Sequence, residues 1–262
     1  MKIVLFCGGL GMRLREYSDT VPKPLVPVGD NPLIWHLMKY YAHFGHKDFI
    51  LCLGHKAELI KKYFIDYQEA LSCDFVLSNG GKNVEVLNRD FQDWRITFVD
   101  TGIRASVGER LYAVRDYLAE EEVFLANYVD GLTDLNLHTL IDHFYKLGKA
   151  ACFLAVRPTQ TFHLVDVDDD GYALSIEHIS DSKSWMNGGF FVFNRKIFDF
   201  LGPREELVEE SFKRLIQSKE LVAYRHRGFW ACMDTFKEKQ QLEDLWETGN
   251  APWQVWLKNG KM

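Results

Sequence analysis

IVLFCGGLGMRL, residues 3–14, is the stretch of sequence that decides the fold. An apolar run of strand type leads directly into a cluster of glycines, and the cluster ends at Arg13. This order predicts a buried strand and then a loop, because glycine tolerates positive φ values and lets a ligand approach the backbone. Lys23 follows within VPKPL, residues 21–25. Successive N–H groups in a concave loop attract anions, so two nearby cations favour a phosphate-binding site.

An ordinary turn after a strand is the alternative explanation of the glycine cluster. The spacing differs from the dinucleotide-binding fingerprint, because Leu14 stands where that fingerprint has its third glycine. It also differs from the P-loop pattern G-x-x-x-x-G-K-[ST]. The positive charges of Arg13 and Lys23, so close to the glycines, favour phosphate binding over the turn.

Composition indicates an ordinary globular protein with a substantial core: 262 residues, 47% hydrophobic and 26% charged. A formal net charge of −6 argues against a general nucleic-acid surface, so any positive potential must be local. The first apolar run meets glycines too soon for a signal peptide or a membrane span. The five cysteines are widely spaced and odd in number, which predicts reduced thiols in the cytoplasm and no disulfide framework.

Apolar periodicity alternates between strand and helix along the chain, which predicts an α/β fold with a mostly parallel sheet and helices on both faces. Strands are expected at 49–53, 94–99, 123–128, 150–156, 190–193 and 221–224, and helices at 32–41, 58–64, 110–118, 138–146, 205–217 and 236–247. No linker divides the chain. We therefore expect one domain, 1–262, with 195–262 as a C-terminal extension packed on it.

Motifs spread over nearly the whole chain resemble the sugar-phosphate nucleotidylyltransferases. The opening motif CGGLGMRL with PKP is similar to the superfamily signature, and motifs in the middle and tail are similar to its cytidylyl branch. These are LIWHLMK (33–39), VDTG (99–102), RL before VRDY (110–117), NGGFFV (187–192), GFW with MDT (228–235), and LWE with APW (245–253). The resemblance implies a Rossmann-like, mixed, mostly parallel sheet of the nucleotide-diphospho-sugar transferase type.

The resemblance also implies a reaction. CTP and a phosphorylated small molecule, by default glucose 1-phosphate, would give a CDP-linked product and pyrophosphate by in-line attack at the α-phosphorus. The cofactor would be Mg²⁺, and a homo-oligomer is expected. Because several phosphates converge, the main chemical task is to hold like charges together and to stabilise the leaving pyrophosphate.

Carried over position by position, the resemblance implies the site residues. Catalytic roles fall to Lys23, Arg13 and Asp130. Nucleotide binding falls to Cys7, Gly8, Gly9, Gly11, Met12, Arg13, Lys23 and Arg110. Asp130 and Asp234 would hold the metal, whose hard character suits oxygen ligands. Acceptor binding falls to Asn187, Gly188, His178 and Glu177.

Three of these residues have simpler alternative explanations. Asp130 could cap a turn, and Asp234 could be the N-cap of the last helix. Arg110 could neutralise a surface glutamate, Glu109 or Glu120. The family order in which the residues occur favours the functional explanation.

The chain departs from the family pattern at four positions. Met12 replaces a threonine, Val21 a lysine and Val129 a glycine. His178 replaces the lysine that binds the hexose phosphate, and a histidine is shorter and only partly charged at neutral pH. Two alternatives therefore remain: a phosphorylated acceptor other than glucose 1-phosphate, with Lys183 a possible substitute cation, or a catalytically weak nucleotide-binding relative with a regulatory role.

Overall fold

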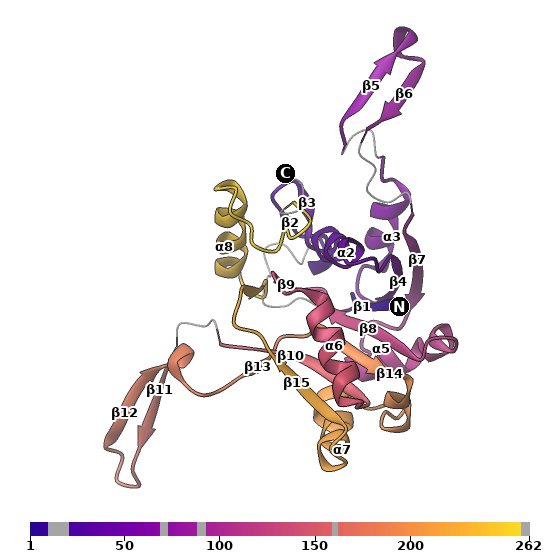
Figure 1. Cartoon of the computed structure of the whole chain (residues 1–262). Coiled ribbons are helices and arrows are strands. Elements are labelled where there is room, and N and C mark those ends of the chain that lie inside the picture. The colour runs from indigo at the N-terminus through magenta and orange to yellow at the C-terminus, as the bar shows by residue number, and fades with distance from the viewer. Residues whose placement is uncertain (10–20, 69–72, 88–92, 159–161, 258–262) are drawn as a thin grey trace.

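The computed structural model describes residues 1–9, 21–68, 73–87, 93–158 and 162–257. A mixed eight-stranded sheet runs through its centre, with helices on both faces (Figure 1). The strands of this sheet are β1 (Lys2–Phe6), β4 (Asp48–Leu53), β7 (Arg95–Asp100), β8 (Val123–Tyr128), β10 (Ala151–Val156), β13 (Met186–Asn187), β14 (Phe191–Asn194) and β15 (Leu221–Arg225). The predicted mixed, mostly parallel sheet is confirmed.

Strand order places the carboxyl ends of the parallel strands at one edge of the sheet. Neighbours follow in the order β7, β4, β1, β8, β14, β10, with β13 and β15 also paired to β10. The pairs β4–β7, β1–β4, β1–β8 and β10–β15 are parallel, and β14 is antiparallel to both β8 and β10. The ends of β1, β8, β10 and β15 therefore share one edge, where ligands collect in open α/β sheets.

The helices occur largely where the periodicity predicts them. They are α2 (Leu33–His43), α3 (Ala57–Ile65), α5 (Val107–Ala113), α6 (Leu137–Leu147), α7 (Phe212–Gln217) and α8 (Phe236–Glu247), with the π-helix η7 (Leu207–Ser211) and the 3-10 helices η2 (Lys23–Leu25), η3 (Asn79–Gly81), η4 (Arg115–Leu118), η5 (Ile179–Asp181) and η6 (Arg195–Asp199). Four two-stranded units complete the fold: β2 (Pro27–Val28) with β3 (Asn31–Pro32), β5 (Phe75–Ser78) with β6 (Asn83–Val86), β9 (Gly131–Thr133) with β16 (Trp230–Cys232), and β11 (His163–Val167) with β12 (Ala173–His178).

Two predicted helices have the wrong bounds. The helix expected at 110–118 begins at Val107, because Ser106 and Glu109 form a capping box, and only η4 continues after α5. The helix expected at 205–217 is split, because its first turn is the π-helix η7, whose N-cap is Glu206. In both cases a side-chain cap determines where the helix begins, and hydrophobic periodicity does not reveal such caps.

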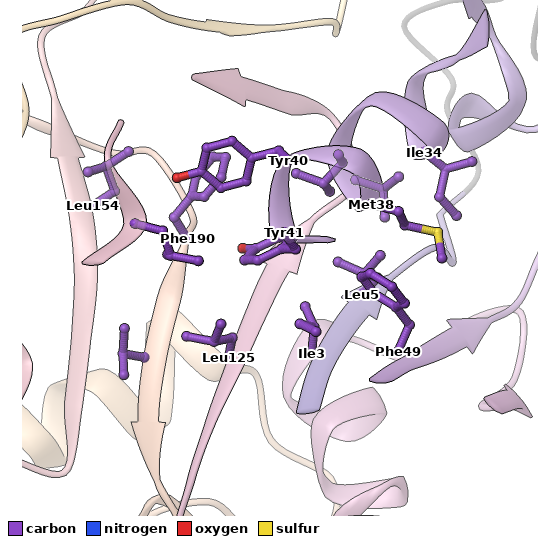
Figure 2. Close-up of a cluster of buried hydrophobic side chains, with 14 of the residues drawn as sticks. Ile3, Leu5, Ile34, Met38, Tyr40, Tyr41, Phe49, Leu125, Leu154 and Phe190 are labelled. Carbon is purple, nitrogen blue, oxygen red and sulfur yellow. The ribbon is translucent and has the colours of Figure 1, made fainter. Parts of the chain in front are cut away.

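Both faces of the central strands are buried. In β1, Ile3 and Leu5 point into one core cluster while Val4 points into the cluster on the opposite face. Strand side chains alternate between faces, so an uninterrupted apolar run is what a sheet covered on both sides requires. Figure 2 shows the first cluster, where the rings of Tyr40 and Tyr41 from α2 pack over the strands.

Two hairpins, β5–β6 and β11–β12, project from the sheet (Figure 1). They carry exposed apolar side chains, including Leu77 at 58% and Ile176 at 69% exposure. All five cysteines are free thiols. Within the described ranges, no helix combines the length and the apolar character that crossing a bilayer demands.

Candidate active site

Lys23, Asp130 and Asp234 meet at the carboxyl-end edge of the sheet, and we call them the carboxylate–lysine centre. The ammonium Nζ of Lys23 donates to Oδ2 of Asp130 at 2.8 Å and to Oδ1 of Asp234 at 2.6 Å. The lysine side chain is 18% exposed and the aspartates are 32% and 35% exposed, so a ligand can reach the centre from one side. Burial alone would lower the pKa of Lys23, but the charges and hydrogen bonds of the two aspartates outweigh it and raise that pKa.

Strand pairing explains why two aspartates so distant in sequence converge. Asp130 lies in the turn between β8 and β9, and Asp234 follows β16. β9 and β16 are antiparallel with Gly131 opposite Cys232, and the N–H of Met233 donates to the carbonyl of Asp130 at 2.9 Å. This register brings the two aspartates to the same end of the ladder.

The carboxylate of Asp234 is not the cap of the last helix. Thr235 is the N-cap of α8 and forms a capping box with Glu238. Oδ1 of Asp234 contacts Lys23, while Oε2 of Glu238 accepts from the N–H groups of both Asp234 and Thr235 at 2.8 Å. The capping box therefore fixes the backbone of Asp234. The T-x-x-E pattern at 235–238 is the sequence signal for this capping box, and apolar periodicity alone does not reveal it.

Cys232 lies beside the same carboxylates. Burial, followed by the carboxylates of Glu238, Asp234 and Asp130, raises the pKa of this thiol to about 12. The sulfur is therefore protonated at neutral pH and is not a nucleophile.

Arg110 is buried, so it does not neutralise a surface glutamate. Its side chain is 1% exposed, and it donates to the carbonyl of Leu53 at 3.0 Å and to the hydroxyl of Thr101 at 2.6 Å. The guanidinium lies against Gly8 and Gly54: a Cβ on Gly8 would come within 2.1 Å of it, and one on Gly54 within 2.9 Å. The close approach of Arg110 explains why a glycine is needed at position 8, although the φ angle of Gly8 is not positive. Because the buried guanidinium is poorly solvated, the pKa of Arg110 is lowered.

Cys7 directly follows β1, and its backbone N–H already donates to the carbonyl of Cys52 at 3.0 Å. N–H groups that could meet a phosphate therefore begin no earlier than Gly8. Burial raises the pKa of the Cys7 thiol well above its usual value. Gly9 is exposed, and no atom of the described residues would obstruct a Cβ there. Gly11, Met12 and Arg13 lie outside the described residues.

Asn187 and Gly188, two of the residues expected to bind the acceptor, lie at this edge beside the end of β10. The amide of Asn187 donates to the hydroxyl of Tyr128 at 3.4 Å, and its Oδ1 accepts from the N–H of Gly189 at 3.0 Å. The indole N–H of Trp230 donates to the carbonyl of Gly188 at 3.0 Å. A Cβ on Gly188 would lie only 3.0 Å from Val156, so this strand edge is closely packed.

Glu177 and His178 lie outside the carboxylate–lysine centre, on β12 of a projecting hairpin (Figure 1). Glu177 is exposed, and the ring of His178 packs edge-on against that of His163 with centroids 5.2 Å apart. Lys183 is exposed on the loop that follows η5. The structure thus joins Lys23, Asp130 and Asp234 and leaves these acceptor candidates on a separate element.

No three histidines, cysteines or acidic residues converge as a ready-made metal site anywhere in the described part of the chain. Asp130 and Asp234 supply two carboxylates. A divalent ion at this centre would need further ligands from substrate and water, which is the usual arrangement for Mg²⁺ with nucleotides.

Comparisons with known proteins identify the family of the chain. The family model for nucleotidyl transferases matches residues 2–247. Glucose-1-phosphate cytidylyltransferases from Salmonella typhi and Salmonella typhimurium (strain LT2) are each 39% identical over 98% of this chain and 100% of their own length. Among solved structures, a UDP-glucose pyrophosphorylase matches with a TM-score of 0.69 at 14% identity over 95% of this chain and 98% of its own, which shows a shared fold. The chain therefore belongs to the nucleotidyl transferase family, in the branch of the glucose-1-phosphate cytidylyltransferases.

Proposed function

We propose that this protein transfers a cytidylyl group from CTP to a phosphorylated small molecule and releases pyrophosphate. The observation that carries the proposal is the carboxylate–lysine centre, in which Lys23 joins Asp130 and Asp234 at the end of β8. The names of the relatives supply CTP and, as the default acceptor, glucose 1-phosphate.

Mg²⁺ is the proposed cofactor, and the centre suits it. Two carboxylate oxygens that contact one nitrogen are close enough to lie around one small cation, and such oxygens are the preferred ligands of Mg²⁺. Asp130 and Asp234 would hold the ion. Bound there, it would neutralise phosphate charge and polarise the α-phosphoryl group.

Lys23 has two successive tasks in this proposal. Without ligands its ammonium holds the aspartates together, and its raised pKa keeps it charged at neutral pH. When substrates bind, the same ammonium would turn to the phosphates at the reacting centre and stabilise charge as the phosphoryl group is transferred. Arg110 adds positive charge beneath Gly8, and the loop backbone with Arg13 would bind the leaving pyrophosphate.

The acceptor is the less constrained part of the proposal. Asn187 and Gly188 are the proposed acceptor contacts, with Glu177 and His178 approaching from β12. Because His178 replaces a lysine, a non-glucose phosphorylated acceptor is the second candidate. A catalytically weak, regulatory nucleotide-binding protein is less favoured, because Lys23, Asp130 and Asp234 are all in contact.

We also propose a single nucleotidyltransferase domain over 1–262, with 195–262 as its extension, that works as a cytoplasmic homo-oligomer. Several exposed apolar side chains lie together on each of the β5–β6 and β11–β12 hairpins and support self-association, since contiguous apolar patches are rarely left in water on a monomer. Analytical ultracentrifugation would test this: a monomer at micromolar concentration would contradict it.

Pyrophosphate release tests the proposed function. The protein is incubated with Mg²⁺, each of the four nucleoside triphosphates, and a panel of phosphorylated acceptors that includes glucose 1-phosphate. We expect pyrophosphate and a CDP-linked product with CTP, and loss of both when EDTA removes the metal. Measurable CTP binding without turnover on any acceptor would favour the regulatory alternative.

A further inference from the structure

An arginine–tryptophan cluster, Arg157, Trp185, Arg225 and Arg227, lies outside the carboxylate–lysine centre. The guanidinium carbons of all three arginines lie over the indole of Trp185, at 4.4, 5.5 and 5.9 Å from its centroid. Attraction between a cation and the face of an indole accounts for each contact singly. Three positive charges around one ring nevertheless repel one another.

The charge of this cluster is not compensated within the protein. Across the described ranges, none of the three arginines forms an ion pair with an aspartate or glutamate. Arg157 donates to the backbone carbonyls of Ser182 and Ser184 at 2.8 and 2.9 Å. Asp134, an acidic residue near this segment, bonds to the ring of His226 at 2.9 Å. Concentrated positive charge on a protein of net charge −6 indicates a site for an external anion.

Strand register places the cluster next to the proposed acceptor contacts. Ala155 of β10 pairs with Asn187 on one side and with Arg225 on the other. Because neighbouring strands are about 4.8 Å apart, the backbones of Asn187 and Arg225 are separated by roughly 10 Å. Trp185 precedes Asn187 by two residues. The cluster therefore borders the acceptor side of the site.

The same register shows that the cluster is too distant to hold the reacting phosphate. β14 lies between β10 and β8, and β15 lies beyond β10, so Arg225 is about three strand spacings, or roughly 15 Å, from the strand that leads to Asp130. An anion bound by the arginines must therefore be a different group from the phosphate that attacks CTP.

We propose that the arginine–tryptophan cluster binds a second anionic group of the acceptor, a carboxylate or a second phosphate at the end opposite the reacting phosphate. This inference rests on the proposed nucleotidyl transfer and narrows its acceptor. Guanidinium groups bind both kinds of anion through paired hydrogen bonds, and the indole offers an apolar face to the carbon skeleton between the two charges. Glucose 1-phosphate lacks a second anion, so it is a poor substrate in this proposal.

The test compares acceptors that differ only at the far end: glucose 1-phosphate, glucuronic acid 1-phosphate and glucose 1,6-bisphosphate, each with CTP and Mg²⁺. We expect kcat/KM for at least one of the two acceptors with a second anion to exceed that for glucose 1-phosphate by about tenfold or more. The bisphosphate and the uronic acid distinguish phosphate from carboxylate recognition.

The variants R225Q and R227Q, both at exposed positions, are expected to remove the higher kcat/KM for the acceptors with a second anion, with KM for CTP unchanged. R95Q, on β7 at the other edge of the sheet, is the control and should keep it.

Equal kcat/KM for the three acceptors, or an advantage that survives R225Q combined with R227Q, overturns the inference and leaves the proposed function standing. Absence of turnover with every acceptor contradicts the proposed function instead. In that event, calorimetric titration with glucuronic acid 1-phosphate and glucose 1,6-bisphosphate decides the inference. Binding weakened by R225Q and R227Q supports it, and no binding of either compound overturns it.

Discussion

The carboxylate–lysine centre and the arginine–tryptophan cluster lie along the same edge of the sheet and treat charge in opposite ways. In the centre, one ammonium contacts two carboxylates, so the positive charge is balanced internally. In the cluster, three guanidinium groups surround a neutral ring. The ammonium of Lys23 is therefore held in place by the protein's own carboxylates, whereas the guanidinium groups of the cluster would be compensated by an anionic ligand. The pair thus separates the residues that are positioned for chemistry from those that select the molecule.

The largest effect should come from removing a carboxylate of the centre. D234N keeps the size of the side chain but weakens metal binding, so we expect turnover to fall by about 1,000-fold or more. D142N, at an exposed position on α6, is the control. Pyrophosphate release at saturating Mg²⁺ measures both. Activity within threefold of the parent in D234N would remove Asp234 from the metal site and end the contrast between the two regions.

Acid should destabilise the fold through His36, a buried histidine that belongs to neither region. His36 is fully buried; its Nε2 donates to the carbonyl of Val28 at 2.9 Å, and its Nδ1 accepts from the indole N–H of Trp253 at 3.3 Å. Burial lowers the pKa of His36 from 6.5 to about 4. The neutral ring therefore stabilises the fold above pH 6.5, and about 3 kcal/mol of stability should be lost as the pH falls from 6.5 through 4. Urea unfolding between pH 7 and 4 measures it.

H36Q is the comparison for that experiment, because its amide can also donate and accept but does not titrate. We expect it to be less stable than the parent at pH 7 and to show a shallower pH dependence below 6.5. An equally steep dependence in H36Q would assign the acid sensitivity to other groups.

G8A tests Arg110, a cation that differs from those of both regions because it is buried against neutral hydrogen-bond partners. The new Cβ would overlap the guanidinium of Arg110 at 2.1 Å, so we expect a loss of about 1–3 kcal/mol in stability. G9A is the matched control, because within the described part of the chain no atom lies within 4 Å of a Cβ at the neighbouring glycine. Thermal and urea unfolding compare the two. Equal stability of G8A and G9A would show that Arg110 moves aside without cost.

The smallest effect concerns the lysine of the centre at alkaline pH. The pKa of Lys23 is raised above its ordinary value of 10.5, so its stabilising charge is intact below that pH and is lost as the pH rises through the raised value. Because the aspartates are about one-third exposed, we expect a contribution of only about 1 kcal/mol. K23Q should therefore lose less stability than the parent between pH 10 and 11.5. Parallel unfolding curves for K23Q and the parent would mean that the two ion pairs contribute nothing to the fold.

Much of the architecture could be predicted from the sequence because it depends on local apolar patterns. β8 has the predicted bounds, and so does α8, which begins with the capping box of Thr235 and Glu238. Asp130 and Asp234 were expected to meet on resemblance alone, since nothing local indicates that β9 pairs with β16. The starts of α5 and α7 were missed because side-chain caps and a π-helix determine them.

The arginine–tryptophan cluster was beyond sequence reasoning for a similar physical reason. Its members come from the ends of β10 and β15 and from the segment before β13, and only the pairing of these strands brings them to one ring. The burial of Arg110 was missed because periodicity places it on the exposed-looking first turn of a helix, whereas two glycines, Gly8 and Gly54, leave room for its guanidinium.

The pairing of β9 with β16 has a consequence for protein synthesis. The ribosome delivers Lys23 and Asp130 long before Asp234, and α8, which fixes Asp234, leaves the tunnel later still. A growing chain can complete most of the sheet and still lack one of the two acidic partners. Competence for catalysis is therefore acquired only after Asp234 and α8 have emerged, and a nascent polypeptide halted before residue 230 should be silent as an enzyme.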